Sequence, residues 1–217
     1  MRSLASRRAQ GGFTLVEIAI VLVIVGLLLA GVLKGQELIE NSKIKNIAKD
    51  MDGIPSAVLS YRDRYKALPG DETVNTTTAY GWAANVGGGN GDGYLGGAVP
   101  SFTGATAEQA NAMRALRFAG FLSGDPALTA AAALPTHSGG GRIAVGGAAA
   151  GTWGIAGNVV CMNGLSGKYA GALDRLLDDG VNNTGSVRGS TAAIAAAAPA
   201  AAAYNEATVN FTICKAL

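Results

Sequence analysis

A long apolar stretch near the N-terminus, residues 13–33, constrains this chain more than any other feature of its sequence. The segment before it carries only positive charge and ends in Gly11-Gly12. A conventional secretory signal places a small-residue cleavage site after an apolar core of about 7–15 residues. Here the candidate site, between Gly12 and Phe13, precedes the core, and no A-x-A-like site follows it. Because about 20 apolar residues span a bilayer as a helix, the stretch is predicted to be a retained anchor.

The charge distribution orients this anchor and narrows the function. By the positive-inside rule the basic leader stays cytoplasmic, and everything after Lys34 is expected outside. The net charge of +2 comes from 17 basic and 15 acidic residues. Arg2, Arg7 and Arg8 lie in the leader, so its removal would leave a nearly neutral chain. No general nucleic-acid binding is therefore expected.

Glu17 is the one acidic residue of the apolar stretch. A carboxylate inside a spanning helix costs about 2.5–3.5 kcal/mol on insertion scales, so it is rarely there without a partner. Cleavage between Gly12 and Phe13 would create an α-amino group one helical turn before Glu17. We expect that amine, from the same or a neighbouring subunit, to be the counter-charge. In the alternative, Glu17 lies at the bilayer interface of an ordinary signal anchor.

The order Gly12-Phe13-Thr14-Leu15-Val16-Glu17 followed by a long apolar helix resembles the class III prepilin signal of type IV pilins and type II secretion pseudopilins. The resemblance implies cleavage after Gly12 by a prepilin peptidase and N-methylation of Phe13. It also implies that Glu17 pairs with the amine of an adjacent subunit during assembly.

The same resemblance implies a structural, non-enzymatic subunit that forms a homopolymeric helical filament. Its expected partners are further copies of itself, the prepilin peptidase, and the pilus or type II secretion assembly machinery. The precursor is expected in the bacterial inner membrane, and the assembled protein in an extracellular pilus or a periplasmic pseudopilus. Motility, adhesion, DNA uptake and secretion all remain open as roles, and so does the choice between major and minor subunit.

Beyond Lys34 the apolar residues recur in alternating steps of three and four, which predicts one buried stripe on a continuing helix. Gly53 and Pro55 predict a kink, and Gly26, Gly31 and Gly35 are the weak positions nearer the N-terminus. The turn Leu68-Pro69-Gly70-Asp71 is expected to stop the helix. The stripe consists of Ile44, Ile47, Met51, Ile54, Val58, Tyr61, Tyr65 and Leu68.

These signals predict a leader at 1–12, a membrane or filament-core helix at 13–34, its amphipathic continuation at 35–68 and a globular head at 69–217. The head is predicted to contain a short helix at 106–122, capped by Thr106, and another at 166–179, capped by Ser166 and with Leu173, Leu176 and Leu177 facing inward. Strands are predicted at 142–145, 158–161 and 209–214. Arg114 and Arg117 are expected to be solvated. The Ala-rich segment 191–203 is either a surface loop or a weak helix. The fold class is α+β: the long helix packs on a small antiparallel sheet with short helices and long loops, a topology that the resemblance supplies.

The cysteines and acidic loops complete the list of candidate sites. Cys161 and Cys214 are predicted to form a disulfide, because an exported chain meets an oxidising compartment. No metal or other cofactor is expected. Calcium is the lesser alternative at the glycine-rich stretch 87–93, which lacks a terminal Glu, and at 178–183, where the loop resembles that of major pseudopilins. His137 has no neighbouring titratable group in sequence, which predicts a surface histidine and no catalytic set.

Two rival interpretations remain. A type II secretion pseudopilin shares every N-terminal feature, although the larger head and the wide spacing of Cys161 and Cys214 favour a pilin. A signal-anchored extracytoplasmic enzyme or binding protein would differ by keeping its N-terminus uncleaved.

Overall fold

The computed structural model describes residues 12, 14–73, 78–82, 86, 88–96, 99–103 and 107–217. Residues 1–11 and Phe13 lie outside this set, so the predicted leader and one side of the predicted cleavage site are not described. The chain divides into two compact units, Met1–Ser42 and Lys43–Leu217, and each is described by itself. The second unit is called the head below. The boundaries predicted at residues 12, 34 and 68 concern processing and the membrane, and they stay predictions.

Helix α1 (Leu15–Tyr65) runs through the boundary between the two units. It is helical through Gly53 and Pro55, and the kink expected there stays a prediction. The predicted weak positions Gly26, Gly31 and Gly35 are also helical. The helix ends three residues earlier than the Leu68 turn predicts, because Lys66 adopts a left-handed φ of 59° while its N–H donates to the Arg62 carbonyl at 2.8 Å. Helices commonly end at a residue in the left-handed conformation, and that residue is usually glycine.

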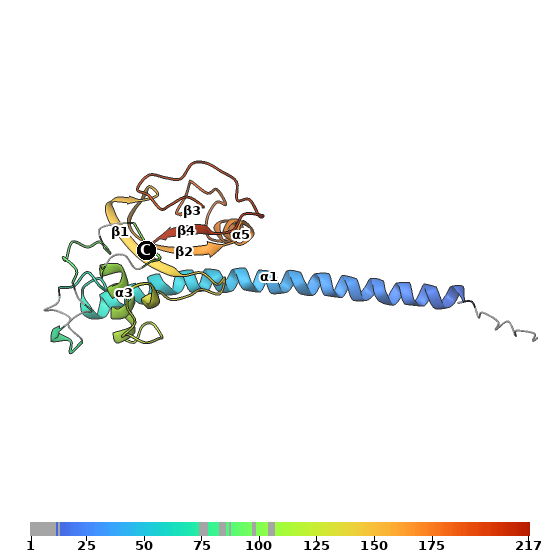
Figure 1. Cartoon of the computed structure of the whole chain (residues 1–217), viewed down its shortest axis with the longest axis horizontal. Helices are drawn as coiled ribbons and strands as arrows, with labels where there is room; N and C mark the ends of the chain where they lie inside the picture. The colour runs from blue at the N-terminus through green and yellow to red at the C-terminus, as the bar shows by residue number, and fades with distance from the viewer. Residues whose placement is uncertain are drawn as a thin grey trace, which may run out of the picture. The chain divides into compact units, whose positions relative to one another are not determined.

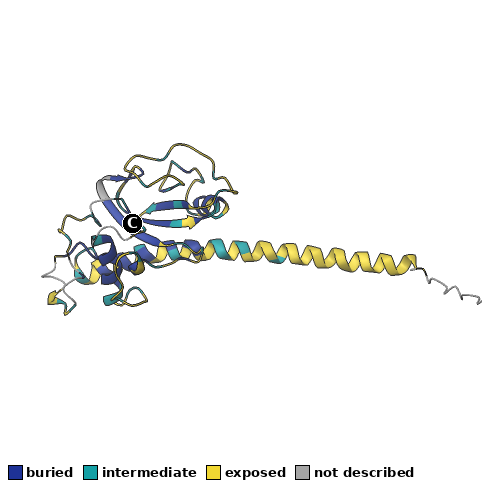
Figure 2. Cartoon of the chain, in the orientation of Figure 1, coloured by how far each residue is buried: buried dark blue, intermediate teal, exposed yellow. Residues whose placement is uncertain are grey.

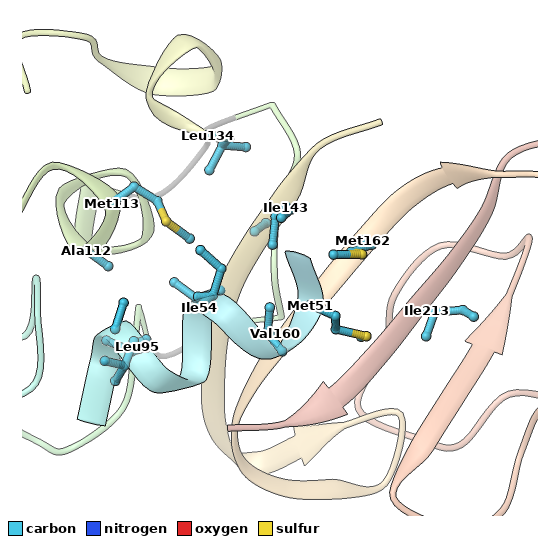
Figure 3. Close-up of a cluster of buried hydrophobic side chains, with 14 of the residues drawn as sticks. Met51, Ile54, Leu95, Ala112, Met113, Leu134, Ile143, Val160, Met162 and Ile213 are labelled. Carbon is cyan, nitrogen blue, oxygen red and sulfur yellow. The ribbon is translucent and has the colours of Figure 1, made fainter. Parts of the chain in front are cut away.

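The predicted stripe on the second half of α1 is the core of the head. Five of its members are buried, and Ile44, Tyr65 and Leu68 are half-buried. Figure 3 shows Met51 and Ile54 of α1 pointing toward side chains of the sheet and of helix α3 (Ala107–Phe118). The α+β class is therefore confirmed, with the amphipathic part of α1 packed on the sheet. The five buried members are Ile47, Met51, Ile54, Val58 and Tyr61.

The sheet is antiparallel, with four strands in the order β1-β2-β4-β3. The strands predicted at 142–145 and 158–161 are confirmed as parts of β1 (Ile143–Thr152) and β2 (Ile155–Leu165). The last strand, β4 (Phe211–Ala216), begins two residues later than predicted, because Asn210 has a left-handed φ of 68°. Strand β3 (Val187–Ser190) was not predicted, since its four residues carry too short an apolar pattern.

The two predicted short helices are present, and the predicted cap of one of them is observed. Helix α5 (Gly167–Leu177) begins after Ser166, whose side chain accepts the Tyr169 N–H, as predicted. The prediction that Leu176 faces inward is wrong: its side chain is 53% exposed, because only one face of α5 packs on the sheet. Helix α3 confirms the helix predicted at 106–122, although its expected cap Thr106 lies outside the described residues. A single turn, α4 (Ala130–Ala133), follows.

The Ala-rich segment 191–203 is a loop, which decides the alternative left open by its composition. Backbone hydrogen bonds tie it to the turn between β1 and β2: Trp153 and Gly154 donate to the carbonyls of Ala195 and Ala196. The Asn182 side chain holds it a second time, donating to the Ala200 carbonyl and accepting the Ala202 N–H. The loop is thus fixed by polar contacts where its alanines offer little to bury.

Candidate processing and assembly site

The start of α1 is organised by Thr14 and Glu17. The Thr14 N–H and hydroxyl both donate to Glu17 Oε2, at 2.7 and 2.8 Å, and the Glu17 N–H donates to the Thr14 hydroxyl at 3.3 Å. This is a reciprocal capping box, in which a Thr at the helix start and a Glu three residues later satisfy each other's backbone groups. The Thr-x-x-Glu spacing was visible in the sequence, and Thr14 was missed as a partner of Glu17.

Among the described residues, the large apolar side chains in the first half of α1 are exposed. Figure 2 colours this half as exposed nearly throughout, and Leu15 is 86% exposed. By length and composition α1 contains a window apolar enough to cross a membrane, and none of that window is buried within the chain. Exposure of large apolar side chains on this scale marks a surface that contacts lipid or another protein.

Gly12 is described and exposed, and a Cβ built on it would meet nothing within 4 Å. Its φ lies outside the left-handed region that favours glycine. The fold therefore gives no structural reason for a glycine at this position.

The two cysteines are joined in a disulfide, Cys161–Cys214, between directly paired positions of β2 and β4. Both sulfurs belong to a buried cluster with Trp153, Ile155 and Val159. The bridge closes a segment with a sequence separation of 53, which contains α5, β3 and the Ala-rich loop. It therefore fastens a part of the head that contains a long irregular connection, residues 191–210.

A buried tyrosine and a buried carboxyl link the end of α1 to the segment that follows it. The Tyr61 hydroxyl lies 2.8 and 2.6 Å from the two carboxylate oxygens of Glu72. Burial raises the pKa of Glu72, and burial with the nearby carboxylate raises the pKa of Tyr61. The contact was not predicted, because the residues bear no motif and their sequence neighbourhoods indicate only a helix and a turn.

Asp71 holds the glycine-rich stretch that was compared with a calcium loop. Its two carboxylate oxygens accept the N–H groups of Gly91 and Gly93, at 2.8 and 2.9 Å. Asp92 accepts the N–H of Tyr94 and the side-chain amide of Asn90. The described part of this stretch, residues 88–96, is thus organised by backbone amides donating to carboxylates.

Asp174, Asp178 and Asp179 place carboxylate oxygens within 4.8 Å of one another at the end of α5. Most of these oxygens already accept hydrogen bonds. Tyr204 and Gly180 donate to Asp174, Thr184 and Val181 to Asp179, and Ser186 and Val187 to one oxygen of Asp178. Calcium requires about six to eight oxygen ligands, whereas most of the carboxylate oxygens gathered here already accept hydrogen bonds from the protein. The arrangement does not fit calcium as it stands.

Two surface predictions are wrong. His137 is only 4% exposed: its Nδ1 accepts the Gly139 N–H at 3.0 Å, which leaves Nε2 to donate to the Asn163 carbonyl at 2.8 Å. Burial lowers its pKa, against the opposing effects of that hydrogen bond and of Asp50. Arg114 is also buried and donates to the Pro126 carbonyl and the Asn111 side chain. Arg117 is half-buried and donates to the Ser123 carbonyl.

These corrected residues form no catalytic arrangement in the part of the chain that the structure describes. Ser138, the hydroxyl next to His137, donates to Asp50 at 2.6 Å, and the histidine nitrogens are occupied by backbone groups. A nucleophile activated by a base requires a contact between the two. The histidine instead joins the loop 137–141 to β2.

Comparison with known proteins gives one finding, and it concerns the N-terminus. Residues 7–33 match the family model of the prokaryotic N-terminal methylation motif. No curated protein and no solved structure matches the chain. The matched residues include Gly12, Phe13 and Glu17 and the whole apolar stretch 13–33.

Proposed function

Since the chain carries the N-terminal methylation signal of type IV pilins and pseudopilins, we propose that it is a structural subunit of a type IV pilus-like filament. The observation that carries the proposal is the helix that follows this signal. Its first half exposes a continuous apolar surface, while its second half forms the core of a disulfide-bonded head. A precursor anchored in the inner membrane, cut after Gly12 and then polymerised, accounts for both halves.

Hydrophobic burial favours assembly in this proposal. An apolar helix covered by lipid in the precursor becomes covered by the helices of other subunits in the filament, so its surface stays out of water throughout. The filament is extracellular, with the apolar halves of α1 in its interior and the heads on its surface. Gly12 serves the peptidase, which agrees with the absence of any folding reason for a glycine there.

Glu17 has two roles in succession. In the separate chain its carboxylate closes the helix start through Thr14. In the filament it pairs with the Phe13 amine of an adjacent subunit, which compensates for a charge placed in an apolar interior.

Processing is tested by the intact mass of assembled material. We expect the chain to begin at Phe13 with one added methyl group. Replacement of Gly12 by a bulky residue should leave an uncut, membrane-bound precursor. Retention of residues 1–12 in filaments would contradict the proposal, and it would favour the signal-anchored alternative.

Glu17→Ala tests assembly. The variant should be cut and should keep a stable head, yet its filament yield should fall by about tenfold or more, since a lost ion pair in an apolar setting is expensive. Glu17→Gln is the matched control, because it keeps a side chain that can accept the Thr14 hydrogen bonds but cannot pair with an amine. Both variants must be expressed without a wild-type copy, and a normal yield from either would contradict the role of the charge.

A pseudopilin of a type II secretion system is the second candidate, because the matched N-terminal signal is common to pilins and pseudopilins. Electron microscopy of surface filaments, in a strain with and without the gene, separates the two. Long surface filaments that vanish with the gene support a pilus. A secretion defect without surface filaments supports the pseudopilus.

A further inference from the structure

A hollow of about 410 Å³ lies beside the C-terminal end of α1. Its lining joins the last turn of that helix, the segment 66–73 and the glycine-rich stretch at Gly91 and Gly93. Ala67 and Leu68 supply apolar surface, and Arg62 and Lys66 stand one helical turn apart at the same hollow. A second hollow of about 210 Å³ shares Arg62 and Leu68 with it.

The two cations have no carboxylate partner among the described residues. Both side chains are exposed and neither makes a described ion pair or side-chain hydrogen bond. The acidic residues of the lining, Asp71 and Glu72, are buried and directed to other donors, the Gly91 and Gly93 amides and the Tyr61 hydroxyl. Asp63 lies between the cations in sequence but does not line the hollow. The hollow therefore suits an acidic side chain carried on a small apolar segment.

One described loop of the same chain, residues 205–209, carries an acidic side chain beside an apolar one. Glu206 is exposed and its carboxylate makes no described contact, and Val209 beside it is 65% exposed. The loop is held in shape from within, because Asn205 accepts the N–H groups of Ala207 and Thr208. A preformed loop loses little conformational freedom when it binds.

The loop and the hollow lie at opposite ends of the head. The loop is fastened to the start of α5, where the Gly167 N–H donates to the Thr208 carbonyl at 2.8 Å. In the same part of α5, the Tyr169 ring lies 5.0 Å beneath the Lys43 ammonium at the first residue of the head. The hollow begins at Arg62, and α3, which contacts Gly70 next to it, lies at the other end from α5 in Figure 1. Along α1, residues 43 and 66 are about 35 Å apart.

We propose that the Asn205–Val209 loop of one copy binds the Arg62–Lys66 hollow of a second copy, as a head-to-tail contact along the α1 direction. The inference rests on the proposed function and adds the residues that join successive heads. Two different complementary surfaces at opposite ends of one domain make a heterologous interface, which generates an open chain when the rotation does not close. Glu206 supplies the charge that selects the register, and Val209 supplies apolar contact to Ala67 and Leu68.

Charge reversal tests the contact in the full-length chain, expressed without a wild-type copy. Glu206→Lys should lower filament yield by about tenfold, since like charges across an interface repel strongly. The pair Arg62→Glu with Lys66→Glu should do the same, and the three substitutions together should restore most of the yield. Asp63→Lys is the matched control: it makes the same charge change on an exposed residue outside the hollow and should leave the yield unchanged.

Cross-linking provides a measurement that does not depend on yield. A chain with Lys66→Cys and Glu206→Cys, treated with a mild oxidant in assembled form, should give a ladder of multimers on a non-reducing gel, while either single variant should not. The native cysteines are bonded to each other and buried, so they do not compete.

The outcomes separate this contact from the proposed function. Wild-type filaments together with a normal yield from Glu206→Lys, or with no ladder from the double-cysteine chain, would overturn the head-to-tail contact and leave the pilin assignment intact. A ladder that stops at dimers would also overturn it, because a symmetric contact would then hold the copies. Absence of filaments from the unaltered chain would contradict the proposed function and this contact together.

Discussion

The two halves of α1 have the same secondary structure and opposite sources of stability. In the first half, Leu15 to Ile39, the large apolar side chains are exposed, and the described chain places nothing over them. In the second half, one face from Ile47 to Tyr61 is buried against the sheet and α3. A long helix in water draws most of its stability from packing rather than from propensity. The first half therefore depends on lipid or on other subunits, and the second depends on its own head.

This contrast predicts that substitutions divide by position. Changes in the head should alter its unfolding free energy and affect assembly only as a consequence. Changes in the first half should alter assembly and leave the unfolding of the head unchanged. The following experiments test that division, in order of decreasing expected effect.

Removal of the disulfide should have the largest effect on the head. In the chain-entropy model a closed loop of roughly 50 residues contributes about 4 kcal/mol, so Cys214→Ser should lower the unfolding free energy by a similar amount. Cleavage at Gly12 should be unaffected, because that site belongs to the other unit. Denaturant unfolding of the processed protein measures the loss, and non-reducing peptide mapping checks the bridge. Two alkylatable thiols in assembled wild-type protein would refute the contribution of the bridge.

Truncation of one buried side chain in the second half comes next. Met51 is fully buried in the core, so Met51→Ala should lower the unfolding free energy of the head by about 2–5 kcal/mol. Leu27→Ala is the matched control on the exposed half of the same helix. It should leave head unfolding unchanged, and a comparable loss from both variants would show that the two halves do not differ as described.

The smallest expected effect is a pH dependence of head stability that comes from His137. Its lowered pKa means that the unfolded chain binds a proton at a higher pH than the folded head does. Stability from the neutral ring is therefore present above the ordinary histidine pKa of about 6.5, and it is lost as the pH falls from there toward the lowered folded value. The slope within that window is at most about 1.4 kcal/mol per pH unit.

His137→Gln should remove most of this slope while retaining a group that can donate to the Asn163 carbonyl. Asp50 is the charged group that acts on the ring from α1, so Asp50→Asn is the companion variant and should steepen the pH dependence. Denaturant unfolding between pH 5 and pH 7.5 measures both. A wild-type slope that His137→Gln does not change would assign the dependence to titratable groups other than His137. Glu72 and Asp174 are not among them, because their raised pKa values make stability fall as the pH rises.

The periodic elements of the fold were predictable, and most of the polar contacts were not. The stripe from Ile47 to Tyr61 follows the helical period, so its buried face could be assigned without coordinates. Ser166 as the cap of α5 follows from local hydrogen bonding in the same way. His137 was assigned to the surface because no titratable group neighbours it in sequence, yet the distant Asn163 carbonyl satisfies the histidine in the interior.

In the candidate site, too, the local features were predictable and the contacts between distant residues were not. The sequence by itself determined the order of leader, glycine and apolar helix, the position of Glu17 and the amphipathic continuation of the helix, because each depends on residues within a few helical turns. Only the tertiary structure decided that Tyr61 binds Glu72, that Asn182 holds the Ala-rich loop and that Tyr204 binds Asp174. It also placed the Glu206 loop and the Arg62 hollow at opposite ends of the head. In each of these contacts the local sequence around one residue does not indicate its partner. Burial and hydrogen bonding depend instead on which segments the fold brings together.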